Sequence, residues 1–368
     1  MKKILLATSA IIAVGLIAAP VMAAEKKAAG PIKLGVSGYM HQTISHTSQD
    51  DSTGQPGANQ HNTNMSADGE VHFKGSTTLD NGVTVGVDFQ LEGDQSGDQM
   101  DEHYVTFAGA FGKFFIGSEN GAGNKSFRGS SVPGPQWIST WSSALGTYAG
   151  GTNGAANNFR NDVSGDSDKI TYFTPKMNGF EVGVSYTWDS TEDGTAGNGD
   201  NTAGDQSNIW ELGATYSGNT GKDGVSYNVS GAYIKGDNEA TTAGTTNSKV
   251  WALGADVTFS GLTVAGGYYK DNNATTGSNS DKVEWNAGIK SSSGPWAYGI
   301  SYSNTEVGAG AGLGDDTRDH WIAAASYAFG PGVSFSGALE SVNLDDDLNA
   351  AGAENSVTAI HLGTSLFF

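Results

Sequence analysis

The strongest constraint on the fold is a two-residue alternation of apolar and polar or small side chains that recurs along the chain. In FEVGVSYTW (180–188) the aromatic and valine side chains occupy one face of an extended strand, and Glu, Gly, Ser and Thr occupy the other. The same alternation recurs at 83–92, 210–216, 251–259, 283–289, 296–302 and 321–329. Helical periodicity is confined to the first residues. Repetition of this kind predicts antiparallel strands.

The alternation predicts an even number of strands joined by two kinds of connection. Sixteen strands are expected, at 32–43, 70–79, 83–92, 102–109, 112–118, 168–174, 179–188, 208–217, 225–234, 249–258, 262–270, 282–290, 295–303, 319–329, 332–341 and 356–368. Short connections (80–82, 110–111, 330–331) alternate with long ones (44–69, 189–207, 304–318, 342–355). Long loops therefore gather at one end, which a membrane barrel built of hairpins requires and a soluble sandwich does not.

The length of the strands and the end of the chain point to closure of the sheet. About ten residues at ~3.3 Å each, tilted by ~45°, cover roughly the ~25 Å apolar band of an outer membrane. Lipid offers no hydrogen bonds, so the sheet must close on itself. The last strand stays apolar on one face up to Phe368 and must pair with the strand at 32–43. The predicted fold class is all-β, a transmembrane sixteen-stranded antiparallel β-barrel.

The N-terminus and the composition define the compartment. Two lysines, an apolar run at 4–19 and small residues before Ala24 predict a signal peptide at 1–23, with the barrel at 24–368. A retained membrane helix is the weaker alternative, because the run is about 16 residues long. The chain has no Cys and a net charge of −20, or −22 without Lys2 and Lys3. Disulfides, thiolate chemistry and nucleic-acid binding are thereby excluded.

The tryptophans predict two aromatic belts on the outer surface. Five of them (Trp188, Trp210, Trp251, Trp285, Trp321) fall near the long-loop ends of strands, and Trp296 falls near the short-turn end. Phe180, Tyr216, Phe259 and Tyr327 also fall near the short-turn end. Interfacial aromatics produce such a pattern, whereas a soluble core would scatter them. The first six strands and the last one lack Trp, so we expect neighbouring copies to cover that sector.

Three hairpins carry a family resemblance. GEVHFKGSTTLDNGVTVGVDFQLEGD (69–94), YVTFAGAFGKFFIGSENGAG (104–123) and DKITYFTPKMNGFEVGVSYT (168–187) resemble successive hairpins of the Gram-negative general porins, especially the alphaproteobacterial ones. The terminal Phe matches the assembly signal of that family. The resemblance implies a homotrimer of water-filled barrels in the outer membrane of a Gram-negative bacterium, each narrowed by an inward-folded third loop. Here that constriction loop is 119–167, and its aromatic content predicts packing on the inner wall.

The charges expected in the lumen depart from the family pattern. Ser118 and Glu70 stand where the family usually has basic residues, whereas Arg160 matches a family Arg. Alternation and the loop together give these pore-lining and constriction candidates: Arg160, Lys74, Lys33, His72, Glu70, Asp88, Glu119, Arg128, Asp162 and Asp166. For each of them, an ordinary solvated side chain is the simpler alternative. The lumen candidates include few basic residues, and the net charge of the chain is negative. These two features predict weak cation selectivity.

The expected function is passive diffusion of ions and small hydrophilic solutes, without enzymatic activity, catalytic residues or cofactors. Two alternatives stay open: a substrate-selective porin, and an outer-membrane adhesin or scaffold with a plugged lumen. The plugged form predicts no conductance. The acidic loops 313–319 and 344–349 could bind Ca²⁺ or bridge lipopolysaccharide, although solvated loop charge explains them more simply. The expected partners are outer-membrane lipid and lipopolysaccharide, further copies of the chain and the transported solutes.

Overall fold

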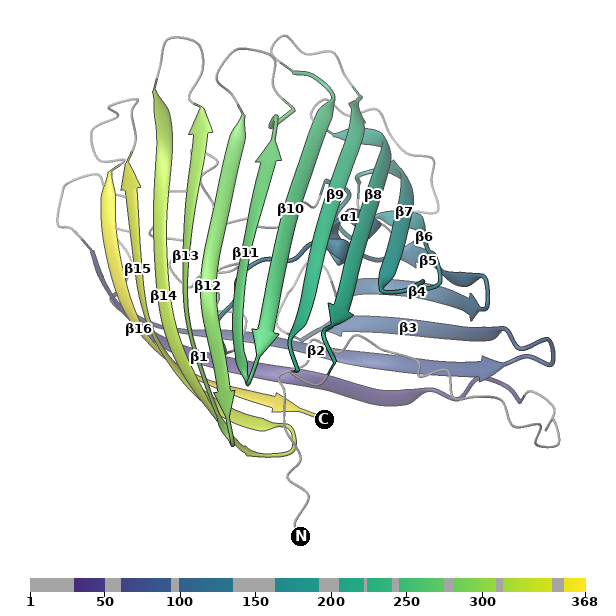
Figure 1. Cartoon of the computed structure of the whole chain (residues 1–368), viewed down its shortest axis with the longest axis horizontal. Helices are drawn as coiled ribbons and strands as arrows, with labels where there is room; N and C mark the ends of the chain where they lie inside the picture. Colours follow the sequence, from purple (N-terminus) through teal and green to yellow (C-terminus); the bar gives the residue numbers. More distant parts are fainter. Residues whose placement is uncertain are drawn as a thin grey trace.

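The chain folds into one closed antiparallel barrel (Figure 1). The computed structural model describes residues 30–49, 61–93, 99–134, 163–191, 205–221, 224–239, 245–274, 281–308, 314–345 and 354–368. Each strand pairs with its neighbours along the chain, and β1 pairs with β16. The sixteen-stranded fold predicted from the alternation is therefore confirmed. The predicted signal peptide lies outside the described residues.

The strands and the single helix of the described residues have the following bounds. They are β1 (Gly35–Gln49), β2 (Thr63–Thr78), β3 (Thr84–Glu92), β4 (Met100–Gly109), β5 (Gly112–Ser118), α1 (Ala122–Ser126), β6 (Asp168–Phe173), β7 (Phe180–Asp189), β8 (Gln206–Asn219), β9 (Ser226–Asn238), β10 (Ser248–Phe259), β11 (Leu262–Asp271), β12 (Lys282–Ser293), β13 (Trp296–Gly308), β14 (Asp315–Gly330), β15 (Val333–Asp345) and β16 (Asn355–Phe367). Among the described residues, no helix is long and apolar enough to cross a membrane.

The barrel closes between the last strand and the first. Tyr39 stands opposite Phe367, and the backbone amides of Gly38 and Phe368 each donate to the other's carbonyl, at 2.9 and 3.0 Å. A Cβ at Gly38 would lie 2.9 Å from the Phe368 ring, so glycine allows this ring to sit on the first strand. Phe368 itself is 63% exposed on the outer surface. The terminal strand is thus a wall strand to its last residue, as the sequence predicts.

The two ends of the barrel differ as expected, but several strands extend further than the alternation predicts. Short turns such as Ser260–Gly261 lie at one end, and the long connections lie at the other (Figure 1). At the long-loop end β1 runs to Gln49 instead of residue 43, and β14 begins at Asp315 instead of residue 319. The added residues are mostly polar on both faces. Ladder hydrogen bonds do not require an apolar face outside the lipid, so pairing continues after the alternation stops.

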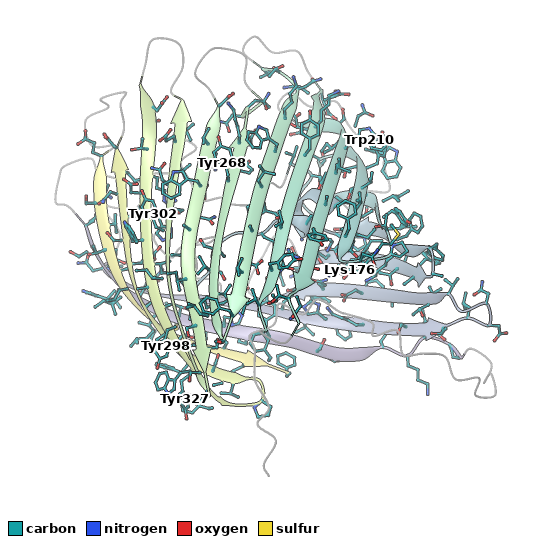
Figure 2. The ribbon with its side chains drawn as sticks, viewed as in Figure 1. Lys176, Trp210, Tyr268, Tyr298, Tyr302 and Tyr327 are labelled. Atoms are coloured by element: carbon teal, nitrogen blue, oxygen red, sulfur yellow. The ribbon has the colours of Figure 1, made fainter. Side chains whose placement is uncertain are left out.

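The outer surface carries the two predicted rows of aromatic side chains (Figure 2). At the long-loop end Trp210 contacts the Tyr186 ring and Trp251 the Tyr268 ring, with centroids 4.8 and 5.0 Å apart. The row continues with Trp285, Tyr302 and Trp321. At the short-turn end Trp296 contacts Tyr298 and Tyr327. Aromatic rings at both edges of an apolar band are typical of barrels in an outer membrane.

Candidate functional site

The chain enters the lumen at the end of β5, where Gly117 adopts a φ of +130°. A Cβ at this position would lie 2.4 Å from the carbonyl oxygen of His103, so no other residue fits. The bend turns Ser118 inward. Its hydroxyl donates to the carbonyl oxygens of Asp101, at 3.3 Å, and of Asp166. The beginning and the end of the constriction loop are therefore joined at the wall.

A buried carboxylate on β8 anchors both ends of this loop. Glu211, which is 1% exposed, accepts hydrogen bonds from the amide of Gly123 in α1 at 2.9 Å and from the hydroxyl of Ser164 at 2.6 Å. A Cβ at Gly121 would lie 2.1 Å from this carboxylate, so glycine permits the close approach. On β7, Ser185 accepts from the Ala122 amide at 2.7 Å. Glu211 is not among the residues predicted from the sequence, because nothing local marks a contact 88 positions away.

An apolar patch on the inner wall holds the next part of the loop. Phe127 packs in a buried cluster formed by Ile209, Ala232, Ile234, Val250, Ala252 and Tyr269. The alternation predicts polar residues at inward positions, and for this patch that expectation is wrong. A sequence signal does exist: Ile209, Ile234 and Val250 each adjoin an outward aromatic residue, so these stretches are apolar on both faces. A strand that is apolar on both faces must be shielded from water on both faces.

The described part of the loop then follows the wall towards β13. The amide of Ser130 donates to Asn286 Oδ1 at 2.8 Å, and its hydroxyl lies 2.6 Å from the hydroxyl of Ser301. Val132 packs with Ile322, Ala324 and Ala338. The described residues 119–134 and 163–167 thus lie against the inner wall, and the inward folding of the whole loop 119–167 stays a prediction. Arg160 and Asp162 lie outside the described residues.

Four of the predicted lumen residues meet on β2 and β3. Asp88 Oδ2 lies 3.0 Å from Lys74 Nζ and accepts from the Tyr104 hydroxyl at 3.0 Å. His72 Nε2 lies 3.4 Å from Glu70 Oε1, and His72 Nδ1 lies 3.7 Å from Asp88 Oδ1. Alternation places these side chains on one face, and the register of β2 against β3 sets Lys74 opposite Asp88. The structure therefore brings these four side chains together, and their role in lining the ion path stays a prediction.

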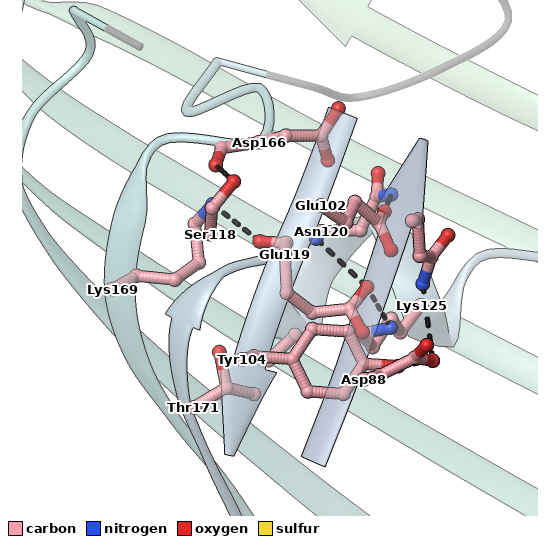
Figure 3. Close-up of polar contacts among 12 residues, drawn as sticks. Asp88, Glu102, Tyr104, Ser118, Glu119, Asn120, Lys125, Asp166, Lys169 and Thr171 are labelled. Carbon is pink, nitrogen blue, oxygen red and sulfur yellow. Dashed lines mark hydrogen bonds and ion pairs between the residues drawn. The ribbon is translucent and has the colours of Figure 1, made fainter. Parts of the chain in front are cut away.

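A second group of carboxylates stands where β4 and β5 meet the loop (Figure 3). Glu119 lies 2.5 Å from Lys125 Nζ, and Glu102 accepts from the Asn120 side chain at 2.8 Å. Glu119 and Glu102 are both buried, and Asp166 approaches them from the end of the loop (Figure 3). The Lys169 amine donates to the carbonyl oxygens of Glu119, Gly165 and Ser167. Glu102 was not predicted, although it alternates with outward Val105 and Phe107 along β4.

Two predicted residues lie apart from these carboxylates. Arg128 is exposed on the loop, where its Nη1 donates to the carbonyl oxygens of Phe127 at 2.8 Å and Lys125 at 3.3 Å. Lys33 is exposed and precedes β1, which begins at Gly35 and not at residue 32. Within the described residues, no group of three or more His, Asp or Glu side chains could hold a metal ion. The suggested calcium-binding loops lie partly outside them.

The comparisons agree with this architecture. A family model described as Gram-negative porin matches residues 7–347. Among solved structures, a porin refined at 1.8 Å resolution has 20% identity and a TM-score of 0.60 over 91% of this chain and 100% of its own. An anion-selective porin from Comamonas acidovorans has 14% identity and a TM-score of 0.65, covering 92% of this chain and 100% of its own.

A third solved structure is the trimer form of OmpT from Vibrio cholerae, with 12% identity and a TM-score of 0.61 over 93% of this chain and 100% of that one. At these identities the structural likeness establishes the fold. A search among curated proteins finds no match.

Proposed function

The chain belongs to the Gram-negative porin family, and from that membership we propose that its barrel is a weakly cation-selective diffusion channel. It is an outer-membrane channel through which ions and small hydrophilic solutes diffuse passively. The family and the fold indicate a channel rather than an enzyme. The cation preference is the new element.

The observation that carries the preference is the set of carboxylates at the loop entrance. Glu70, Asp88, Glu102 and Glu119 are all buried on the β2–β5 side of the lumen. Lys74 pairs with Asp88, Lys125 with Glu119 and His72 with Glu70, so among the described residues Glu102 is the member of this group that forms no ion pair. The whole chain has a net charge of −20. A narrow aqueous passage with a negative wall raises the local concentration of cations.

Reversal potentials of purified protein in planar bilayers test the proposal. In a KCl gradient the permeability ratio of K⁺ to Cl⁻ should exceed one. The ratio should be larger near 0.1 M than near 1 M KCl, because the Debye length falls from about 10 Å to about 3 Å. Anion preference at both concentrations would contradict the proposal. Absence of any conductance would instead favour a plugged scaffold.

We further propose that the barrel assembles as a homotrimer through its tryptophan-free sector, the contiguous strands β15, β16 and β1–β6. Trp side chains are absent from these strands, whose outer surface exposes residues such as Val36, Ile44, Leu339 and Leu362. The solved OmpT neighbour is described as a trimer. The remaining outer surface would face lipid, and lipopolysaccharide at the long-loop end. Cross-linking in native membranes should yield trimers, and monomers alone would oppose this.

A further inference from the structure

A pocket lies between the constriction loop and the inner wall of β10–β12. Its lining includes Phe127, Arg128 and Ser131 from the loop, and Asp256, Thr258 and Lys290 from the strands. The loop lies directly on the wall here, since a Cβ at Gly254 would be 1.8 Å from the carbonyl oxygen of Arg128. The pocket lies towards the short-turn end of the barrel, because Thr258 and the neighbouring Thr263 flank the Ser260–Gly261 turn. That end faces the periplasm in bacterial outer-membrane barrels.

The cations of this pocket donate to neutral oxygen atoms. Arg128 donates to two backbone carbonyls, as described above, and Lys290 Nζ donates to the Ser131 hydroxyl at 3.3 Å. Neither forms an ion pair with a carboxylate of the described residues. Asp256, the one acid in the lining, accepts from the Asn228 side chain at 2.9 Å. The formal charge of the lining is therefore +1, from Arg128, Lys290 and Asp256.

Hydroxyl groups and an aromatic ring complete the lining. Thr258 and Thr263 stand opposite each other with their hydroxyl oxygens 2.8 Å apart, and Ser131 lies beside Lys290. The Phe127 side chain adds an apolar surface. A guanidinium presents several N–H donors in one plane, which suits a carboxylate, and a nearby ammonium adds a second charge-assisted bond. The hydroxyls can bond to alcohol groups of the same solute.

We propose that this pocket is a binding subsite for small polyhydroxylated solutes carrying one carboxylate, such as sugar acids. The single net positive charge matches one carboxylate, and Asp256 disfavours more highly charged anions. A solute held here would pause on the periplasmic side of the constriction. The subsite goes beyond the proposed cation preference and requires only that the barrel conducts.

Gluconate and sorbitol form a matched pair of probes, because they share a six-carbon polyol chain and only gluconate has a carboxylate. Single-channel current in KCl would be recorded while potassium gluconate or sorbitol is added to the short-turn side. Gluconate should reduce the open-channel current in a saturable manner. Sorbitol at equal concentration should cause only the proportional decrease due to viscosity.

Substitutions of the pocket residues test whether the gluconate block arises in this pocket. Arg128→Gln combined with Lys290→Met should weaken the apparent gluconate affinity about tenfold, the effect of losing charge-assisted hydrogen bonds worth roughly 1.4 kcal/mol. Arg128→Lys, which keeps the charge, should retain most of the block. Lys176→Gln removes an exposed lysine from the β6–β7 turn at the same end of the barrel (Figure 2) and should leave the block unchanged.

Equal effects of gluconate and sorbitol on the unmodified channel would overturn the subsite, as would a block that survives the double substitution. The cation preference is measured separately, from reversal potentials in KCl without gluconate. A channel without cation preference could therefore still be blocked by gluconate, and a channel that gluconate does not block could still prefer cations.

Discussion

The two sides of the lumen handle charge differently. On the β2–β5 side carboxylates gather and lysines pair with them, as Lys74 pairs with Asp88 and Lys125 with Glu119. On the β10–β12 side Arg128 and Lys290 donate to carbonyl and hydroxyl oxygens instead. The first side is acidic after partial neutralisation, whereas the pocket lining on the second side has a formal charge of +1. The opposite charges of the two sides partly offset each other, so the preference for cations should be weak. Each side can be altered separately by substitution.

The largest effect is expected from releasing the loop that separates the two sides. Glu211→Ala removes the acceptor for Gly123 and Ser164, and hydrogen bonds to a charged group contribute about 1.5–3 kcal/mol each. We expect a higher single-channel conductance, and faster proteolytic cleavage within 119–167 of the folded barrel. Glu181→Ala, on the neighbouring strand β7, is the control. Unchanged conductance and protease resistance in Glu211→Ala would mean that the loop is held by its apolar contacts alone.

The next largest effect should come from neutralising the acidic side. A unit charge about 7 Å from a passing ion contributes about 0.6 kcal/mol in water, or roughly a threefold change in local concentration. Glu102→Gln with Glu119→Gln should lower the K⁺/Cl⁻ permeability ratio by about this factor per charge. Loss of Glu119 also leaves Lys125 without its carboxylate partner, which favours anions. Glu306→Gln, exposed on the outer face of β13, should not change the ratio.

Substitution on the basic side should shift selectivity in the opposite direction. Arg128→Gln with Lys290→Met removes two positive charges and should raise the K⁺/Cl⁻ ratio by about twofold to threefold in reversal-potential measurements. Arg128 is exposed, so screening by salt limits its contribution. An unchanged ratio would show that these cations do not face the ion path, and a decrease would contradict the assignment of this side. Lys176→Gln again serves as the control.

The smallest effect should follow from substituting Asp256, the one acid in the pocket lining. Asp256→Asn leaves the hydrogen bond with Asn228 possible but removes a negative charge beside Arg128 and Lys290. The K⁺/Cl⁻ ratio should fall by less than about twofold, because Asp256 is only half-buried and solvent screens its charge. The same variant should strengthen the gluconate block. Weaker block would indicate that Asp256 orients the solute instead of repelling it.

Much of the fold and part of the site follow from local pattern. Alternation alone places Glu70, His72, Lys74 and Asp88 on one face, and the structure brings them together in the lumen. Strand ends were less predictable, as β1 shows, because pairing outside the lipid needs no apolar face. The inward apolar patch around Phe127 was also missed, although apolar pairs such as Ile209 and Trp210 mark it.

Period-two alternation already assigns one face of each strand to lipid, and the sheet must close because lipid offers no hydrogen-bonding partners. Which inward residues become partners depends on the long-range register of the strands. His361 lies 2.8 Å from Glu340 and 2.7 Å from Ser45, a residue 316 positions away. The register of β1 against β16 creates this contact, and the alternation does not specify that register, because the pattern repeats identically at every two-residue shift.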